Sequence, residues 1–519
     1  MSNDAAIAKP AKPARRSWLW QPNLIVFVSS ACIMILELVA GRLIAPHVGS
    51  SLYTWTSVIG VVLAGISLGN YLGGRLADRW ASLRFLGMIY LLAALASLMV
   101  LYFDRMDQLI VNDWHIVVKI LVLTSAMFFV PCTILGTISP IVAKLSVSDL
   151  ARTGRTVGEI YAAGALGSIV GTFLTGFVLI SAFGSYTIVM SVALVLAAIG
   201  VIFLLLGKWQ SAILAVLVVA GGWMLASNQG WLKSVCVRET NYYCIKIIDQ
   251  DTEGKQIRQL VLDHLVHSFV ELGNPRNMVY GYEKIYAELA QFRSMQKPKQ
   301  SILMIGGGGY TFPRYMEAVY PETTVHVVEI DPGVTQIAHD MLGLGTDTKI
   351  VTFNEDARMF MARQPTTKYD LILGDAFNHY SVPYHLTTKE FNDRVHTWLV
   401  DDGIYAVNII DGPRGEFVRS YYNTLRESFK YTYIAEGNSD WRHAARSFFI
   451  LIGTDKPFEP FAFANFDAGD SDALLARTLA GDAEINKMLT EAPLVLLTDQ
   501  YAPVDQMLAS IFTDEEPPK

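Results

Sequence analysis

The chain has 519 residues, of which 52% are hydrophobic and 17% are charged, and its formal net charge at pH 7 is −7. This length exceeds that of one ordinary domain, and the composition excludes a wholly water-soluble protein. Because nucleic-acid binding depends on basic patches, the negative net charge gives no support for a nucleic-acid partner, and we expect none.

The first 23 residues include the run KPAKPARR, which is basic and rich in proline. No small-residue cleavage pattern follows a short apolar core there, so we expect a cytoplasmic tail rather than a signal peptide.

Residues 24–230 are dominated by apolar runs and predict a membrane domain of about seven helices, since a helix needs about 20 apolar residues to cross a bilayer. The fourth run is long and contains Pro131 and Pro140, so we expect a kinked or split helix there. The seven runs extend from Leu24 to Ala45, Val58 to Leu76, Phe85 to Phe103, Ile116 to Leu145, Val157 to Ile180, Ile188 to Leu206 and Ala212 to Ser227.

Basic residues gather after the second, fourth and sixth runs, on the side that these loops share with the N-terminal tail. They are Arg75, Arg79, Arg84, Lys144, Arg152, Arg155 and Lys208. The positive-inside rule places that side in the cytoplasm, and seven crossings would then place the C-terminal half outside. One crossing more or fewer reverses the result, so the side of the C-terminal half stays open.

Two cysteines, Cys236 and Cys244, lie across a predicted hairpin in the water-soluble half. We interpret them as unpaired thiols. The alternative is a disulfide, which would favour an external location for this half.

Residues 231–298 predict a small antiparallel β-sheet and a helix. The runs CVRETNYYCIKIID and QIRQLVLDHLVHSFV alternate as strands do, and the helix extends from Tyr282 to Gln296.

Residues 299–519 alternate between apolar strands and helices, which predicts an α/β Rossmann-like domain with a mostly parallel sheet covered on both faces. Ligands of such sheets bind beyond the carboxyl ends of the strands. The predicted strands are Ser301 to Ile305, Val325 to Glu329, Ile350 to Phe353, Tyr369 to Gly374 and Gly403 to Ile410.

Glycines and acids follow four of these strands. Gly306 to Gly309 allow close approach of a ligand. The carboxylate of Glu329 can accept hydrogen bonds from both ribose hydroxyls, and that of Asp356 can accept one from an adenine amino group. Asp375 points into the same crevice. Any one acid is typical of a solvated loop, but four such sites in register indicate a ribonucleoside. A dinucleotide would require G-x-G-x-x-G, which is absent, so we expect S-adenosylmethionine or a relative, a fold of the class I methyltransferase type, and no metal.

Residues 235–455 resemble the spermidine synthase family of aminopropyltransferases. The runs GGGGYT, VEID and EDA resemble its G-G-G-D-G-G, E-I-D and G-D-[GA] motifs, LVLDHLVHSF resembles its L-D-G-x-x-Q hairpin, and DAFNHYSVPYHLTTKEF resembles its D-S-S-D-P gate. Glu239, Tyr242 and Tyr243 resemble the family's opening E-S-x-Y stretch. The resemblance implies that Glu329 holds the ribose and Asp356 the adenine, and that Tyr243, Asp263 and His267 belong to the substrate site.

The resemblance also implies an activity. The family form is an enzyme that cleaves the sulfonium of decarboxylated S-adenosylmethionine, releases methylthioadenosine and transfers the aminopropyl group to a polyamine such as putrescine. The membrane half carries GISLGNYLGGRLADR, which resembles a loop of major facilitator transporters. The fusion resembles a bacterial membrane subgroup of this family, which implies a multi-pass protein of the bacterial inner membrane. Such a protein contacts lipid and is able to form a homo-oligomer.

Three positions depart from the family's motifs: Gly309 replaces the acid of the glycine loop, Asn378 the second acid of the gate, and His267 the glutamine of the hairpin. Asparagine cannot take a proton, so Asp375 or His379 is the candidate base. An acid at position 309 would repel a donor's carboxylate. Its absence, with Arg314 one helical turn beyond the loop, makes intact S-adenosylmethionine a candidate ligand.

Four functions therefore remain open. They are aminopropyl transfer, a lyase or cyclase acting on intact S-adenosylmethionine without an amine acceptor, an S-adenosylmethionine-dependent methyltransferase, and a polyamine transporter or sensor. Glu37 and Arg42 place charge inside the first predicted span, and helix pairing explains them without transport.

Overall fold

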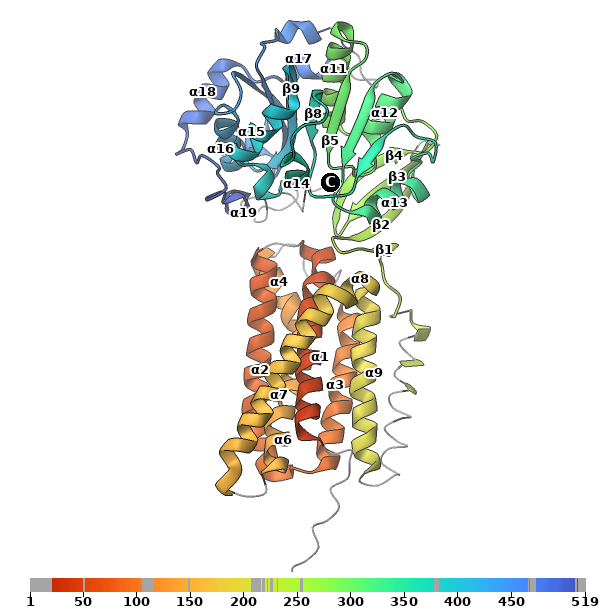
Figure 1. Cartoon of the computed structure of the whole chain (residues 1–519), viewed down its shortest axis with the longest axis vertical. Helices are drawn as coiled ribbons and strands as arrows, with labels where there is room; N and C mark the ends of the chain where they lie inside the picture. The colour runs from red at the N-terminus through yellow and green to blue at the C-terminus, as the bar shows by residue number, and fades with distance from the viewer. Residues whose placement is uncertain are drawn as a thin grey trace, which may run out of the picture. The chain divides into compact units, whose positions relative to one another are not determined.

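The computed structural model is shown in Figure 1. It describes residues 21–49, 52–104, 116–147, 150–206, 216, 220–221, 223–224, 227–230, 232–252, 255–377, 382–464, 466, 473–508 and 511. The chain forms two compact units, one comprising residues 1–40, 59–105 and 125–233, and the other residues 41–58, 106–124 and 234–519.

Within the described residues, six helical stretches are long and apolar enough to cross a membrane. They match the first six predicted runs, whereas the seventh, Ala212 to Ser227, lies largely outside the described residues. The six are α1 (Pro22–Val48), α2 (Leu52–Trp80), α3 (Leu83–Phe103), the stretch Val117–Ser146, the stretch Thr153–Ala182 formed by α7 (Thr153–Leu174), η4 (Thr175–Leu179) and α8 (Ile180–Ala182), and α9 (Ser185–Leu205).

The fourth stretch is split, as its prolines predicted. It consists of α4 (Ile116–Thr124), the π-helical turn η2 (Ser125–Phe129), α5 (Val130–Gly136) and α6 (Ile138–Ser146). Pro131 lies in the first turn of α5 and Pro140 in that of α6, where a missing N–H costs least.

Small residues allow close helix contacts in the first of the two units. A Cβ atom on Gly69 of α2 would lie 2.2 Å from the carbonyl oxygen of Thr133, and one on Gly167 of α7 would lie 2.1 Å from that of Phe27. Such approaches leave no room for a side chain, so the glycine-rich stretches of the sequence serve helix packing.

The second unit begins with an antiparallel sheet in the order β1 (Arg238–Glu239), β2 (Cys244–Thr252), β3 (Lys255–Leu262) and β4 (Leu265–Glu271). Cys236 and Cys244 form a disulfide, so our interpretation of two unpaired thiols is wrong. The Cα atoms of the two cysteines lie 5.3 Å apart, a separation that suits a disulfide. Helix α11 (Gly281–Gln296) follows the sheet.

A seven-stranded sheet forms the centre of this unit, in the order β10-β11-β9-β8-β5-β6-β7. Strands β5 to β9 are parallel neighbours, whereas β10 and β11 are antiparallel and were not predicted from the sequence. The strands are β5 (Ser301–Ile305), β6 (Thr324–Val328), β7 (Val351–Phe353), β8 (Tyr369–Gly374), β9 (Leu399–Asp411), β10 (Tyr431–Glu436) and β11 (Ser447–Thr454).

Alternate residues of the central strands pack into two separate hydrophobic cores. Ile302 and Met304 belong to one core, and Leu303 and Ile305 to the other. This alternation shows that both faces of the sheet are covered, as the continuous apolar strands predicted. The covering helices include α12 (Thr311–Val319), α13 (Pro332–Met341), α14 (Ala357–Met361), α15 (Lys389–Trp398) and α16 (Glu416–Leu425), which Figure 1 shows around the sheet.

A buried ion cluster ties α11 to the beginnings of β5 and β8. The fully buried Asp370 accepts hydrogen bonds from Arg293 at 3.2 Å, from Lys297 at 2.9 Å and from the backbone N–H of Ser301 at 2.8 Å. Arg293 also donates to Asp402 at 3.2 Å, so removing Asp370 takes away one of its carboxylate partners and leaves its buried charge less compensated.

We therefore expect Asp370→Ala to lower the free energy of unfolding of this unit by about 3–5 kcal/mol, and its Tm by roughly 10 °C. The measurement is thermal unfolding of the detergent-solubilised protein, followed by tryptophan fluorescence. Lys297→Met is the control, since the side chain of Lys297 is 49% exposed and its loss costs little. Equal Tm values for the two variants would contradict the prediction.

Candidate functional site

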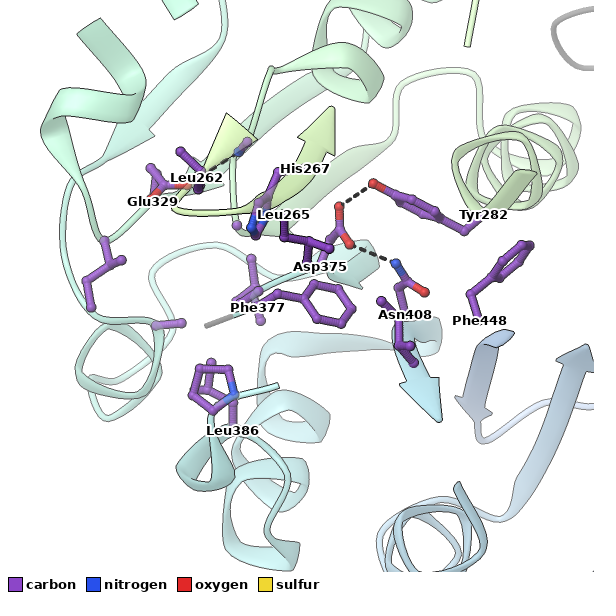
Figure 2. A pocket seen from close by; sticks show the side chains of 18 of the residues that line it. Leu262, Leu265, His267, Tyr282, Glu329, Asp375, Phe377, Leu386, Asn408 and Phe448 are labelled. Atoms are coloured by element: carbon purple, nitrogen blue, oxygen red, sulfur yellow. Dashed lines mark hydrogen bonds between the residues drawn. The ribbon is translucent and has the colours of Figure 1, made fainter. Parts of the chain in front are cut away.

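A cavity of about 440 Å³ opens at the carboxyl ends of the parallel strands, where the sequence predicted a ligand. This volume lies within the range of small-molecule sites. Figure 2 shows side chains that line it. The polar and charged lining residues are Tyr243, His267, Tyr280, Tyr282, Glu329, Glu355, Asp356, Asp375, His385, Asn408, Asn438, Arg446 and Ser447.

The glycine loop after β5 forms one wall of the cavity. Gly306 adopts a positive φ of 95°, and a Cβ atom there would lie 2.4 Å from the carbonyl oxygen of Asp375. Both constraints require glycine. The loop backbone can therefore run close to the end of β8 and present itself to a ligand.

Glu329 follows β6 and is held by the same loop. Its Oε2 accepts hydrogen bonds from the N–H groups of Gly307, at 2.7 Å, and Gly308, at 3.4 Å, and its Oε1 accepts one from Asp331 at 2.9 Å. Burial raises the pKa of Glu329, and these backbone donors oppose the shift. Since a carboxylate has about four acceptor positions, it can bind ligand hydroxyls in addition.

Asp356 caps the first turn of α14 and faces the cavity. One carboxylate oxygen accepts the N–H of Met359 at 3.0 Å, and the other lies 3.1 Å from Nε2 of His385. The capping bond fixes the direction of the carboxylate. His385, which also lines the cavity, is placed beside the group that the sequence analysis assigned to adenine.

Asp375 lies directly after β8, between two donors from different elements. Tyr282 of α11 donates its hydroxyl to Oδ2 at 2.9 Å, and Asn408 of β9 donates its amide to Oδ1 at 3.0 Å, as Figure 2 shows. Burial raises the pKa of Asp375 to about 7, and the two hydrogen bonds oppose part of that shift. A carboxylate with such a pKa can exchange a proton near neutral pH.

A second acid, Glu283 of α11, is buried behind Asp375. Burial, and then the charge of Asp375, raises the pKa of Glu283 to about 8. Glu283 is therefore mostly protonated at neutral pH, and the charge of Asp375 is one of the causes.

The residues assigned to substrate from the sequence divide into two groups. Tyr243 and His267 line the cavity, and burial lowers the pKa of His267 to about 4, so its ring is neutral. Asp263 and Arg314 are not among the lining residues. Asp263, with φ 56°, accepts the N–H of Cys244 in the turn between β3 and β4, and Arg314 is buried beside Gly343.

Gly309 lies behind the cavity wall rather than in it. Its N–H donates to the hydroxyl of Ser268 at 2.8 Å, and a Cβ atom there would lie 2.6 Å from that of Ser268. The remaining catalytic candidates from the sequence, Asn378 and His379, lie outside the described residues.

Tyr282, Glu283, Asn408 and His385 were not predicted from the sequence as site residues. A signal existed for Asn408, which is the one polar residue in the apolar run IYAVNII. Tyr282 and Glu283 open a predicted helix and carry no comparable signal, because their direction depends on how α11 packs against the sheet.

The fold and its cavity define a Rossmann-like domain with an acidic ligand site at the carboxyl ends of its strands. Comparison with known proteins then identifies the domain: residues 283–411 match the family described as "Spermine/spermidine synthase domain". The C-terminal part of the chain therefore contains a spermidine synthase domain.

Curated proteins that are similar to this chain have names that agree with this family. A "Polyamine aminopropyltransferase" of Vibrio vulnificus is 34% identical over 140 residues, which cover 27% of this chain and 46% of that protein. The chain thus spans less than half the length of that relative. "Polyamine aminopropyltransferase 2" of Streptomyces coelicolor is 24% identical over 461 residues, 82% of this chain and 79% of that protein. A solved structure, a probable spermidine synthase from Corynebacterium glutamicum, is 21% identical, covers 51% of this chain and 95% of its own, and has a TM-score of 0.44.

Proposed function

We propose that this protein is a multi-pass membrane enzyme of the aminopropyltransferase type. In the proposed reaction, an amine displaces the aminopropyl group from the sulfonium of decarboxylated S-adenosylmethionine and releases methylthioadenosine. The observation that carries the proposal is the position of Asp375, which lies between Tyr282 and Asn408 in the cavity of a spermidine synthase domain.

The chemistry of the site fits this reaction. The neutral amine forms a new N–C bond as the C–S bond breaks, and the electron pair of that bond neutralises the sulfonium. An alkylamine is protonated near neutral pH, so its nitrogen must lose a proton before it can attack. A carboxylate with a pKa of about 7 is suited to accept that proton, which supports Asp375 as the general base.

Two further acids support an adenosyl group as the other half of the ligand. The Glu329 carboxylate faces the cavity with spare acceptor positions for ribose hydroxyls, and Asp356 offers an acceptor for an amino group of the base.

The test is incubation of the detergent-solubilised protein with intact or decarboxylated S-adenosylmethionine, with and without putrescine. Mass spectrometry would follow methylthioadenosine and the alkyl product. We expect spermidine and methylthioadenosine in equal amounts, from the decarboxylated donor plus putrescine only. A methylated amine together with S-adenosylhomocysteine would overturn the proposal in favour of a methyltransferase, and no turnover would favour a transporter or sensor.

One observation favours a second candidate, a lyase or cyclase that acts on intact S-adenosylmethionine. Residue 309 is a glycine behind the cavity wall, and Ser268 occupies the space that a side chain there would need, so the position has no acid that would repel a donor carboxylate. The donor's own carboxylate could then form the O–C bond as the C–S bond breaks. Methylthioadenosine from intact S-adenosylmethionine without any amine would establish this reaction instead.

The pH dependence separates these reactions. Because only the deprotonated form of Asp375 can accept a proton, and its pKa is about 7, we expect kcat/KM for aminopropyl transfer to fall about tenfold per pH unit below pH 7. Ring closure by a carboxylate needs no base and would show no such fall. The measurement is initial rates of methylthioadenosine release between pH 5.5 and 8.5 in roughly half-unit steps.

A further inference from the structure

A disulfide fastens one wall of the cavity. It joins Cys236 and Cys244 and closes a loop whose residues contact the adjacent sheet. Within this loop, Thr240 donates to Oδ2 of Asp331 at 2.5 Å, and Tyr243, which lines the cavity, donates to the carbonyl oxygen of Phe377 at 3.2 Å. The bond is therefore part of the site's framework rather than of a distant tail.

The chemistry of the bond restricts the compartment in which it persists. Disulfides are stable outside the cytosol, whereas cytosolic reductants keep thiols reduced. The free cysteines among the described residues, Cys32 and Cys132, are both buried in membrane helices. The oxidised pair thus belongs to the second of the two units, which contains residues 234–519 and the cavity and is called the catalytic unit below.

The distribution of basic residues in the membrane half gives independent information on which side of the membrane the second unit lies. Basic residues lie near the end of the second described span, at Arg75 and Arg79, and just beyond it, at Arg84. They gather again around the end of the fourth span, on the side of the basic N-terminal tail. This side is cytoplasmic by the positive-inside rule. The sixth described span, which ends at Leu205, returns the chain to it.

One further crossing is available between Leu205 and the catalytic unit. The stretch from Trp209 to Leu232 contains no charged residue and is long enough to span a bilayer. Those of its residues between 216 and 228 that the structure describes are helical, and apolar side chains among them are exposed, with Met224 at 66% and Val216 at 48%. Such a surface fits lipid rather than water.

We propose that the catalytic unit faces the extracytoplasmic, oxidising side of the membrane, where the Cys236–Cys244 bond forms. This inference has a consequence that rests on the proposed function. An adenosyl donor derives from ATP and is made in the cytosol, so a transport step across the membrane must supply it before the reaction takes place.

Labelling of one introduced cysteine at a time tests the location without requiring turnover. Lys299→Cys places a thiol on the catalytic unit, at a side chain that is 78% exposed, and Asp78→Cys places one at the end of α2 near the basic loop, at a side chain that is 71% exposed. The full-length variants would be expressed in a bacterial host, and intact spheroplasts would be treated with a membrane-impermeant maleimide. The unsubstituted protein gives the background of the native cysteines.

We expect the Lys299→Cys variant to be labelled in intact spheroplasts and the Asp78→Cys variant only after lysis. The reverse pattern would overturn the proposal. Thiol trapping in the same cells adds a second measurement, in which Cys236 and Cys244 should react with maleimide only after reduction. Free thiols at both positions would show that the disulfide does not form in the cell, and this result would overturn the proposal. Because neither measurement uses the enzymatic reaction, failure here is distinct from failure of the proposed function.

Discussion

Replacing Asp375 with asparagine should lower kcat for aminopropyl transfer about 10²- to 10⁴-fold, the usual contribution of a positioned general base. Asparagine has nearly the same size but cannot accept a proton. The fold should tolerate the change, because the buried Oδ1 of Asn408 has no partner among the described residues and can accept from the new amide if the Asn408 side chain rotates. The measurement is methylthioadenosine release by the detergent-solubilised protein at saturating donor and amine.

The matched control is Tyr282→Phe, which removes one donor to Asp375 and keeps the carboxylate. We expect a loss of about 10- to 100-fold, since one hydrogen bond to a charged group contributes about 1.5–3 kcal/mol. The tyrosine hydroxyl lowers the pKa of Asp375, so its removal should also move the inflection of the pH profile above pH 7. The Asp375→Asn variant should lose this inflection. Retention of most of the wild-type kcat by Asp375→Asn would assign proton removal to another group, such as His379.

The second large effect is expected at Glu329. Glu329→Gln should raise the KM for the donor about 10- to 100-fold, because each lost hydrogen bond to the charged carboxylate costs about 1.5–3 kcal/mol. The glutamine NH₂ group would also meet the N–H groups of Gly307 or Asp331, which now donate to carboxylate oxygens. Since the proposed role of Glu329 is to hold the ribose and not to act on the reacting nitrogen, kcat should change little.

Affinity for methylthioadenosine, measured by titration calorimetry, checks this expectation without catalysis. Glu355→Gln is the control. Glu355 also lines the cavity, but it forms an ion pair with Arg363, so its loss should change affinity less than about twofold. Equal affinities of the Glu329→Gln variant and the unsubstituted protein would show that the ribose is held elsewhere.

The sequence predicted much of this site because parallel strands bring their carboxyl ends to one edge. Glu329, Asp356 and Asp375 could be placed together from the strand pattern alone, and the structure brings all three to one cavity. Residues that reach the cavity from other directions were harder to find. Tyr282 lies at the start of a helix, and its contact with Asp375 depends on the packing of α11 across the sheet, which no local pattern encodes.

Other differences between sequence and structure have similar causes. The antiparallel strands β10 and β11 pair through long-range contacts after a parallel region, so the strand–helix alternation gave no indication of them. The state of Cys236 and Cys244 depends on a Cα separation that spacing alone does not determine. Arg314 lies one turn beyond the glycine loop in sequence, but α12 directs it toward Gly343 rather than toward the cavity.

The hydrogen bonds of Glu329 have a consequence for how a ligand binds. Three backbone donors, from Gly307, Gly308 and Asp331, hold one carboxylate and thereby join the glycine loop to the end of β6. The loop therefore has its binding shape before a nucleoside arrives, and little conformational entropy is lost on association. Part of the affinity of this site is thus established when the domain folds, and the ligand meets a rigid surface rather than ordering a mobile one.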